Sequence, residues 1–262
     1  MKTFCFTVDD NIRFLKEITE RAYESIFEHP YLAMYRRLHE AYGLKVQLNL
    51  FYRMEGFDLS QTTAAHTREW MENADWLKLS FHSLFENVSP YEFSGYDEVF
   101  CDCEAVHREI LRFAATESLA KTTTLHYCLA TEEGLRAMKD HDVCGLLGLF
   151  GTGAAPRTSY GIEEETAGRI REGEIVKRNG IAFAPIDVVL NQFSAEKILK
   201  KLSARCHRET LWVMIHEQYF YEDYGAYQPD FEEKLDRTFR FLRDHGYQSA
   251  FFEDVCSASA YE

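Results

Sequence analysis

The chain has 262 residues, of which 46% are hydrophobic and 15% aromatic, a composition typical of a globular protein with a large core. Its net charge of −14 argues against nucleic-acid and anionic-membrane partners, because both are held through Lys and Arg side chains. No apolar stretch approaches the roughly 20 residues of a membrane-spanning helix and no secretion signal precedes the first apolar run, so we expect a cytoplasmic protein.

Short apolar runs with strand character alternate with amphipathic helical patterns along the whole chain. The predicted strands are 3–8, 45–52, 77–81, 122–127, 143–150, 181–190, 211–215 and 248–252. The predicted helices are 11–27, 32–42, 60–73, 96–113, 131–139, 195–206 and 229–245. This alternation predicts an α/β protein whose parallel strands close into a barrel, although an open, doubly wound sheet fits the same pattern. Because no linker interrupts it, we expect one domain over residues 1–262.

The first predicted strand ends at two adjacent carboxylates, Asp9 and Asp10. Neighbouring carboxylates repel each other unless a cation or a proton lies between them, which favours a metal-binding or catalytic pair. The alternative is a helix cap, since an Asp before the helical pattern at 11–27 can accept hydrogen bonds from the first free backbone amides.

The third predicted strand is followed by His82 and Glu86, which are four residues apart. This spacing places both side chains on one face if the chain turns helical just past the strand. Nitrogen and oxygen ligands together suit Zn²⁺ and similar first-row ions better than Ca²⁺. The alternatives are a buried, hydrogen-bonded histidine and a solvated glutamate.

Later strand ends also carry titratable groups, and in a barrel the carboxyl ends of the strands form one face. His126 ends the fourth predicted strand and could bind a metal or the substrate, or be buried and hydrogen-bonded. Asp187 lies late in the sixth and is expected to orient a neighbouring His or Arg. His216 ends the seventh, and an unperturbed pKa near 6.5 suits an imidazole to general acid catalysis.

Two loops look specialised. The loop after His216 is rich in aromatic residues, and its Tyr219 and Tyr221 are candidates for stacking on a sugar, with ordinary packing as the alternative. The loop 151–158 is rich in glycine and small residues but lacks the helix start that a phosphate-binding loop requires.

The Thr-x-Asp-Asp motif that contains Asp9 and Asp10, followed about seventy residues later by His82 and a fourth-position ligand, resembles the polysaccharide deacetylase family, also called NodB-homology or carbohydrate esterase 4 proteins. The strand that ends at His216 resembles a late strand of that family. The resemblance implies a distorted (β/α)7-8 barrel and metal-dependent removal of acetyl groups from glycans. It also implies that Asp9 is the catalytic base, that Asp10 and His82 bind the metal and that His216 is the general acid. Glu86 stands where the family usually has a second histidine.

We therefore predict a metal-dependent carbohydrate deacetylase that acts on a small glycan or amino sugar. The predicted ligands are Asp10, His82 and Glu86, with Zn²⁺ as the expected ion and Co²⁺, Ni²⁺ or Mn²⁺ as alternatives. The substrate contacts are predicted to come from His126, Asp187, Tyr219 and Tyr221. The competing hypothesis is a degenerate barrel that binds a carbohydrate or sugar nucleotide without hydrolysis, because Glu86 replaces a histidine and the family's Arg-x-Pro-Tyr box has no clear counterpart.

The other cysteines and histidines carry no predicted role. Seven cysteines, an odd number scattered through predicted strands and helices, favour reduced thiols. Cys101 and Cys103 have no second pair nearby, so we expect ordinary helix residues. The histidines in predicted helices or at their ends are expected on the surface; they are His66, His107, His141 and His245.

Overall fold

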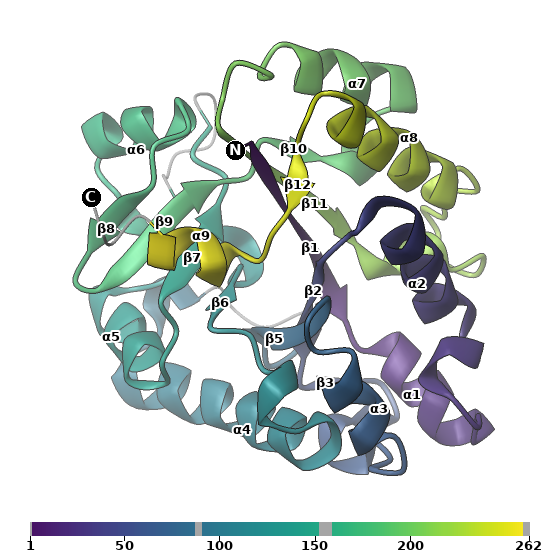
Figure 1. Cartoon of the computed structure of the whole chain (residues 1–262). Coiled ribbons are helices and arrows are strands. Elements are labelled where there is room, and N and C mark those ends of the chain that lie inside the picture. Colours follow the sequence, from purple (N-terminus) through teal and green to yellow (C-terminus); the bar gives the residue numbers. More distant parts are fainter. Residues whose placement is uncertain (1, 87–90, 152–158, 259–262) are drawn as a thin grey trace.

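Apart from one short antiparallel hairpin, the strands form two mainly parallel sheets that lie edge to edge within a layer of helices, as Figure 1 shows. The computed structural model describes residues 2–86, 91–151 and 159–258. The larger sheet has the order β10-β11-β1-β2-β5, and β12 pairs with the start of β1. Its strands are β1 (Thr3–Asn11), β2 (Val46–Phe51), β5 (Leu77–Ser83), β10 (Val188–Val189), β11 (Thr210–His216) and β12 (Gln248–Ser249).

The smaller sheet has the order β6-β7-β9-β8, in which only β8 is antiparallel to its neighbour. Its strands are β6 (Thr122–Thr123), β7 (Gly145–Gly148), β8 (Val176–Arg178) and β9 (Ile181–Pro185). The two sheets meet between β5 and β6, where the Ala120 amide donates to the Leu79 carbonyl at 2.8 Å and the Ser80 hydroxyl donates to the Thr122 carbonyl at 2.7 Å.

A second connection between the sheets follows β9. The predicted strand 181–190 breaks at Pro185, which has no backbone N–H to donate to a neighbouring strand. The next two amides turn to different sheets: Ile186 donates to Gly148 at 2.8 Å and Asp187 donates to Trp212 at 2.9 Å. The chain therefore passes from the smaller sheet into β10 of the larger one, which gives the predicted distorted (β/α) barrel rather than an open, doubly wound sheet.

The helices surround the strands in Figure 1. They are α1 (Arg13–Arg21), α2 (Pro30–Tyr42), α3 (Thr67–Glu72), α4 (Tyr96–Ala114), α5 (Glu132–Asp140), α6 (Glu164–Arg171), α7 (Ala195–Ser203), α8 (Phe231–Asp244) and α9 (Phe252–Ala258). α8 illustrates the packing, because its apolar side lies against β1: the ring of Phe239 is 5.7 Å from Phe4 and 4.9 Å from Phe6. No helix in the described ranges is both long and apolar enough to span a bilayer.

The predicted strand 248–252 is wrong beyond its first two residues. Phe252 begins α9 instead, because a short apolar run is compatible with either a strand or a buried helical turn. Its ring packs 4.7 Å from Trp212, and a Cβ atom on Gly145 would come within 2.7 Å of it. α9 thus covers the amino-terminal ends of β7 and β11. The sequence also did not predict the hairpin of β3 (Arg53–Met54) and β4 (Phe57–Asp58), nor α6 and β8.

Candidate metal centre

The two adjacent carboxylates lie in a β-bulge of β1. The register between β1 and β2 shifts between Val8 and Asn11, and Asp10 has a left-handed backbone with φ 63°. In a regular strand, neighbouring side chains point to opposite faces, whereas a bulge changes that alternation. Asp9 contacts Asn49 on β2 and Asp10 contacts His82 on β5. The strained backbone at Asp10 is of the kind found at functional sites.

Three side chains converge at the carboxyl ends of the strands. Oδ1 of Asp10 lies 3.1 Å from Nε2 of His82 and 3.5 Å from Nδ1 of His126. The two imidazole nitrogens are 3.1 Å apart. A tetrahedral ion with bonds of about 2.0–2.1 Å separates its ligands by about 3.3–3.4 Å, so this triangle has the dimensions of a first-row metal site.

Hydrogen bonds to backbone carbonyls fix which histidine nitrogens face the centre. Nδ1 of His82 donates to the Thr124 carbonyl at 2.5 Å, and Nε2 of His126 donates to the Glu86 carbonyl at 2.9 Å. Each neutral ring therefore turns its lone pair inward, toward the Asp10 carboxylate. Three acceptors then face one another, an arrangement that needs a proton or a metal cation between them. Such carbonyl contacts are the usual outer partners of metal-binding histidines.

Electrostatics shows the same need for positive charge. Burial alone would raise the pKa of Asp10, but hydrogen bonds to His126 and His82 outweigh it and hold the pKa far below its usual range. Burial would lower the pKa of His82, but the charges of Asp9 and Asp10 outweigh it and raise the pKa. A divalent cation bound by the three side chains would take the place of that proton.

The loop that carries His126 is conformationally strained. His126 begins a tight turn after β6, and the next two residues, Tyr127 and Cys128, have left-handed φ angles of 62° and 55°. The ring of Phe51 packs 5.2 Å from His82 and 5.1 Å from His126. This apolar neighbour limits the movement of both imidazoles and excludes water from one side of the centre.

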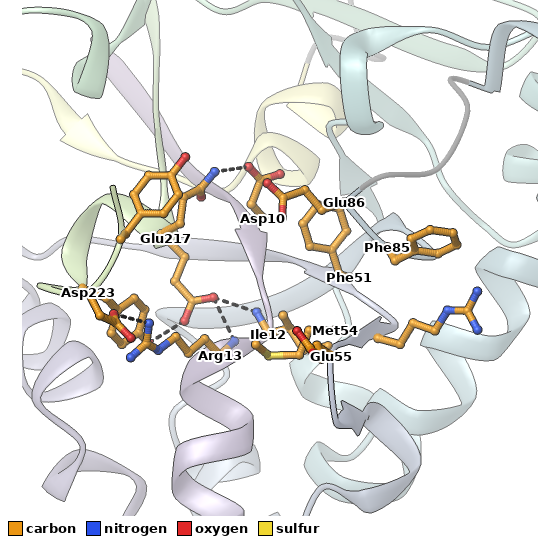
Figure 2. Close-up of a pocket in the computed structure, with 14 residues that line it drawn as sticks. Asp10, Ile12, Arg13, Phe51, Met54, Glu55, Phe85, Glu86, Glu217 and Asp223 are labelled. Carbon is orange, nitrogen blue, oxygen red and sulfur yellow. Dashed lines mark hydrogen bonds and ion pairs between the residues drawn. The ribbon is translucent and has the colours of Figure 1, made fainter. Parts of the chain in front are cut away.

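Glu86 does not join the cluster of Asp10, His82 and His126. The predicted helical turn after the third strand does not form, because β5 continues through His82 to Ser83. Only His82 and Ser83 belong to the strand, and Leu84 to Glu86 follow as a bend and a turn, so the helical stacking of His82 on Glu86 is absent. Glu86 is exposed in a turn, and its backbone carbonyl is what contacts His126. Figure 2 shows its side chain at the same end of the pocket as Asp10. Metal binding by Glu86 therefore stays a prediction that the geometry does not favour.

Asp9 is buried beside the centre. Its Oδ1 accepts a hydrogen bond from Asn49 at 2.7 Å, and it lies opposite His216 on the neighbouring strand β11. Burial raises the pKa of Asp9, and the nearby His82 and His216 oppose the rise only in part. A carboxylate with a raised pKa is a stronger base than an exposed one, as proton abstraction requires.

His216 is held by a residue that the sequence did not single out. Its Nδ1 lies 2.9 Å from Oδ1 of Asn191, and the carbonyl of Asn191 accepts from Gln228 at 2.7 Å. With Nδ1 donating to Asn191, Nε2 is the nitrogen free for proton transfer. The sequence could not have identified Asn191, since it lies 25 residues before His216 with no motif around it.

The alternative interpretation of Asp9 or Asp10 as a helix cap is wrong, because the carboxylate of Glu217 caps α1 instead. This carboxylate accepts from the backbone amides of Ile12 and Arg13 at 2.7 and 3.1 Å, at the start of α1 (Figure 2). It also accepts from the backbone amide of Phe14 at 2.8 Å. Tyr221 adds a fourth hydrogen bond at 2.7 Å. One buried side chain thus joins the end of β11 to the beginning of α1, which keeps Asp9 and His216 on adjacent strands in register.

As the pH rises from roughly 5 to 8, the free energy of unfolding of the wild-type protein should fall by about 2 kcal/mol relative to that of Glu217→Gln. Burial raises the pKa of Glu217 to about 7. In this range the unfolded chain, with an ordinary carboxyl pKa, binds fewer protons than the folded state, so raising the pH favours unfolding. Urea denaturation at several pH values measures the difference. If the unfolding free energies of the two proteins change with pH in parallel, the prediction is wrong, and the four hydrogen-bond donors keep the Glu217 carboxylate ionised over the whole range.

A cavity of about 620 Å³ opens beside the centre. Its lining combines Asp10 with aromatic and polar side chains, among them Phe51, Phe85, Gln218, Tyr221 and Tyr224. Gln218, which the sequence did not identify, donates from Nε2 to Oδ2 of Asp10 at 2.7 Å and so holds the oxygen that does not face the histidines. The ring of Tyr221 lies 3.9 Å below the Arg13 guanidinium, so it serves both packing and the pocket wall.

Other predicted contacts lie elsewhere. Tyr219 is outside the pocket lining, and its ring is 6.1 Å from His216. Asp187 comes just before β10, where it pairs with Arg208 at 2.5 Å and accepts from the Trp212 amide at 3.0 Å. Asp187 is thus near the middle of β11 rather than at its carboxyl end, so its predicted substrate contact is not supported. The predicted pairing of Asp187 with an Arg is observed.

Most of the predicted loop 151–158 lies outside the described residues.

Comparisons with known proteins establish the fold. No family model matches the chain, and no curated protein matches its sequence. The Bc1960 peptidoglycan N-acetylglucosamine deacetylase superposes with a TM-score of 0.54 at 11% identity, over 96% of this chain and 86% of that protein. The carbohydrate deacetylase Agd3 gives 0.58 at 9% identity, over 98% of this chain and 53% of Agd3. The distorted (β/α) barrel predicted from the resemblance to polysaccharide deacetylases is thereby confirmed.

The same fold also occurs in a protein with different chemistry. The 4-α-glucanotransferase from Thermococcus litoralis superposes with a TM-score of 0.59 at 12% identity, over 98% of this chain and 40% of that enzyme. This chain therefore spans less than two thirds of the length of the glucanotransferase and of Agd3. Because one barrel serves both reactions, the chemistry has to be argued from the site.

Proposed function

We propose that this protein, which has the fold of the polysaccharide deacetylases, is a metal-dependent hydrolase that removes an acetyl group from an amino sugar or small glycan. One observation carries the proposal: the inward-facing acceptors of Asp10, His82 and His126 form a metal-sized triangle beside the buried base Asp9. Two imidazoles and one carboxylate leave a position open for water and substrate, as in catalytic rather than structural zinc sites. We therefore propose His126 as the third ligand in place of Glu86.

The residues divide the reaction between them. A divalent ion in this centre would supply Lewis-acid polarisation of the acetyl carbonyl and lower the pKa of a water molecule. Asp9, oriented by Asn49, takes the proton of the attacking water. His216, oriented by Asn191, gives a proton to the departing sugar nitrogen or oxygen. Gln218 holds the second oxygen of Asp10, which keeps that carboxylate aimed at the histidines.

The geometry argues against glycosyl transfer, the reaction of the glucanotransferase with this fold. Glycosidases with two carboxylates use one as an acid and the other as a nucleophile or base on opposite sides of the bond. Here the second carboxylate, Asp10, is occupied by two histidines and Gln218. The non-hydrolytic alternative loses its main premise as well, since His126 supplies the nitrogen ligand that Glu86 does not.

We place the activity in the cytoplasm, because all seven cysteines are free thiols, as a reducing compartment favours. The expected substrate is a small acetylated amino sugar or glycan, for which the aromatic and polar lining of the cavity offers stacking and hydrogen bonds. Zn²⁺ is the expected ion, with Co²⁺, Ni²⁺ and Mn²⁺ as alternatives, and the same donor set also suits Fe²⁺.

A reconstitution assay tests the function. Protein stripped with a chelator should release no acetate from N-acetylglucosamine, its short oligomers or O-acetylated sugars, and one added divalent metal should restore release from at least one of them. Each metal is tested separately, so the panel also identifies the ion. A protein that binds metal and sugar but frees no acetate would support the non-hydrolytic alternative and overturn the proposal.

A further inference from the structure

A second group of metal-binding side chains lies on the outer helices, away from the pocket. Cys103 and His107 lie on α4, and His141 caps the carboxyl end of α5. One ligand atom from each residue lies within 4.8 Å of the others. α4 and α5 run side by side in the outer layer of Figure 1, at the lower left. The cluster thus bridges two helices that are consecutive in the chain.

The geometry of the cluster matches a metal site. Cys103 and His107 are four residues apart on one helix, so their side chains share a face. Sγ of Cys103 is 3.6 Å from Nε2 of His107. A tetrahedral zinc ion, with Zn–S of about 2.3 Å and Zn–N of about 2.0–2.1 Å, separates sulfur from nitrogen by about 3.5–3.6 Å. Nε2 of His141 donates to the Phe100 carbonyl at 3.0 Å, which leaves Nδ1 as a ligand.

Burial makes the cluster hard to explain as packing. The predicted surface position of His107 is wrong, because the side chain is 6% exposed, and Cys103 is fully buried. Among the described residues, the hydrogen bonds of the His107 ring go only to the thiol of Cys103. A neutral imidazole carries one donor and one acceptor, and a thiol is a weak partner for either. Leaving such a ring buried costs free energy that a bound cation would recover.

We infer that Cys103, His107 and His141 form a second metal site, structural in role, that takes Zn²⁺ or a similar borderline ion and fastens α4 to α5. Glu104 or a water molecule completes the tetrahedron from the solvent side: Oε2 of Glu104 lies 3.6 Å from Nδ1 of His141. α5 follows directly on the loop that carries His126, so fastening this helix also restrains the loop of one proposed ligand of the centre at Asp10.

Cobalt distinguishes this site from the centre at Asp10, because only this one contains sulfur. Wild-type protein stripped of metal and titrated with Co²⁺ should bind two equivalents and show a thiolate-to-cobalt charge-transfer band in the near ultraviolet. Cys103→Ser should lose the band and one equivalent. Cys101→Ser is the matched control, since Cys101 is exposed on the same helix and should keep both. Asp10→Asn should lose the other equivalent and retain the band.

His141→Gln, at the end of α5, guards against a folding defect in Cys103→Ser and should also abolish the band. The inference is overturned if wild-type protein shows no thiolate band with Co²⁺, or if the band persists in Cys103→Ser. Because the readout is a sulfur-specific spectrum, it succeeds or fails independently of acetate release and of the function proposed for the pocket.

Discussion

His126→Ala should lose one equivalent of bound metal and lower deacetylation by more than the ~10–100-fold that loss of an outer hydrogen-bond partner of a metal ligand typically costs. The reason is that Nδ1 of His126 supplies one of three inward-facing acceptors, while its Nε2 is already committed to the Glu86 carbonyl. Elemental analysis of the purified variant and acetate release with saturating metal measure the two effects.

Glu86→Gln is the matched variant, because it lies in the same pocket and only its backbone contacts His126. It should bind metal as the wild type does and retain most of the activity. If Glu86→Gln loses the ion while His126→Ala keeps it, the ligand set predicted from the sequence is right and the arrangement proposed from the structure is wrong. Measuring the bound metal of Glu86→Gln and His126→Ala therefore decides whether Glu86 or His126 is the third ligand.

The sequence was sufficient to bring Asp10 and His82 together, since both follow apolar runs and parallel strands end on the same side of a sheet. It was not sufficient to choose the third ligand. That choice depends on where β5 ends: a strand that stops at Phe81 allows a helical turn from His82 to Glu86, whereas the observed strand reaches Ser83. Strand ends are set by pairing with neighbours, which in β5 means β2, and local patterns do not encode that pairing well.

The same distinction holds for the fold. α8 was predicted closely because Pro229, Gly246 and four regularly spaced apolar residues mark it locally. Glu217 and Asn191 were missed because their partners lie far away in sequence: Glu217 caps a helix some 200 residues before it. Hydrogen bonds of that kind follow from the closed arrangement of strands and have no sequence signature.

Asp9→Asn should keep the metal but lower kcat by about 10²–10⁴, the usual contribution of a general base. The substitution preserves an oxygen that can accept from Asn49, so the side chain should stay in place while losing its ability to take a proton. In the wild type, kcat/KM should rise with pH through the raised pKa of Asp9, and this acidic limb should be absent from the variant. Hydrolysis at the parent rate by a metal-loaded Asp9→Asn protein would refute the role.

The proposed role of His216 as general acid is tested by how the rate depends on the leaving group, and not by measuring bound metal. A general acid matters most when the departing group is a poor one, such as the amine of an amino sugar, and least when it is an activated phenol. His216→Gln should therefore lose far more activity on an N-acetylated sugar than on an acetylated phenol, while Asp9→Asn should slow both. If His216→Gln slows both substrates equally, the histidine positions other groups and does not donate the proton, and the acid of this site has to be sought on another strand end.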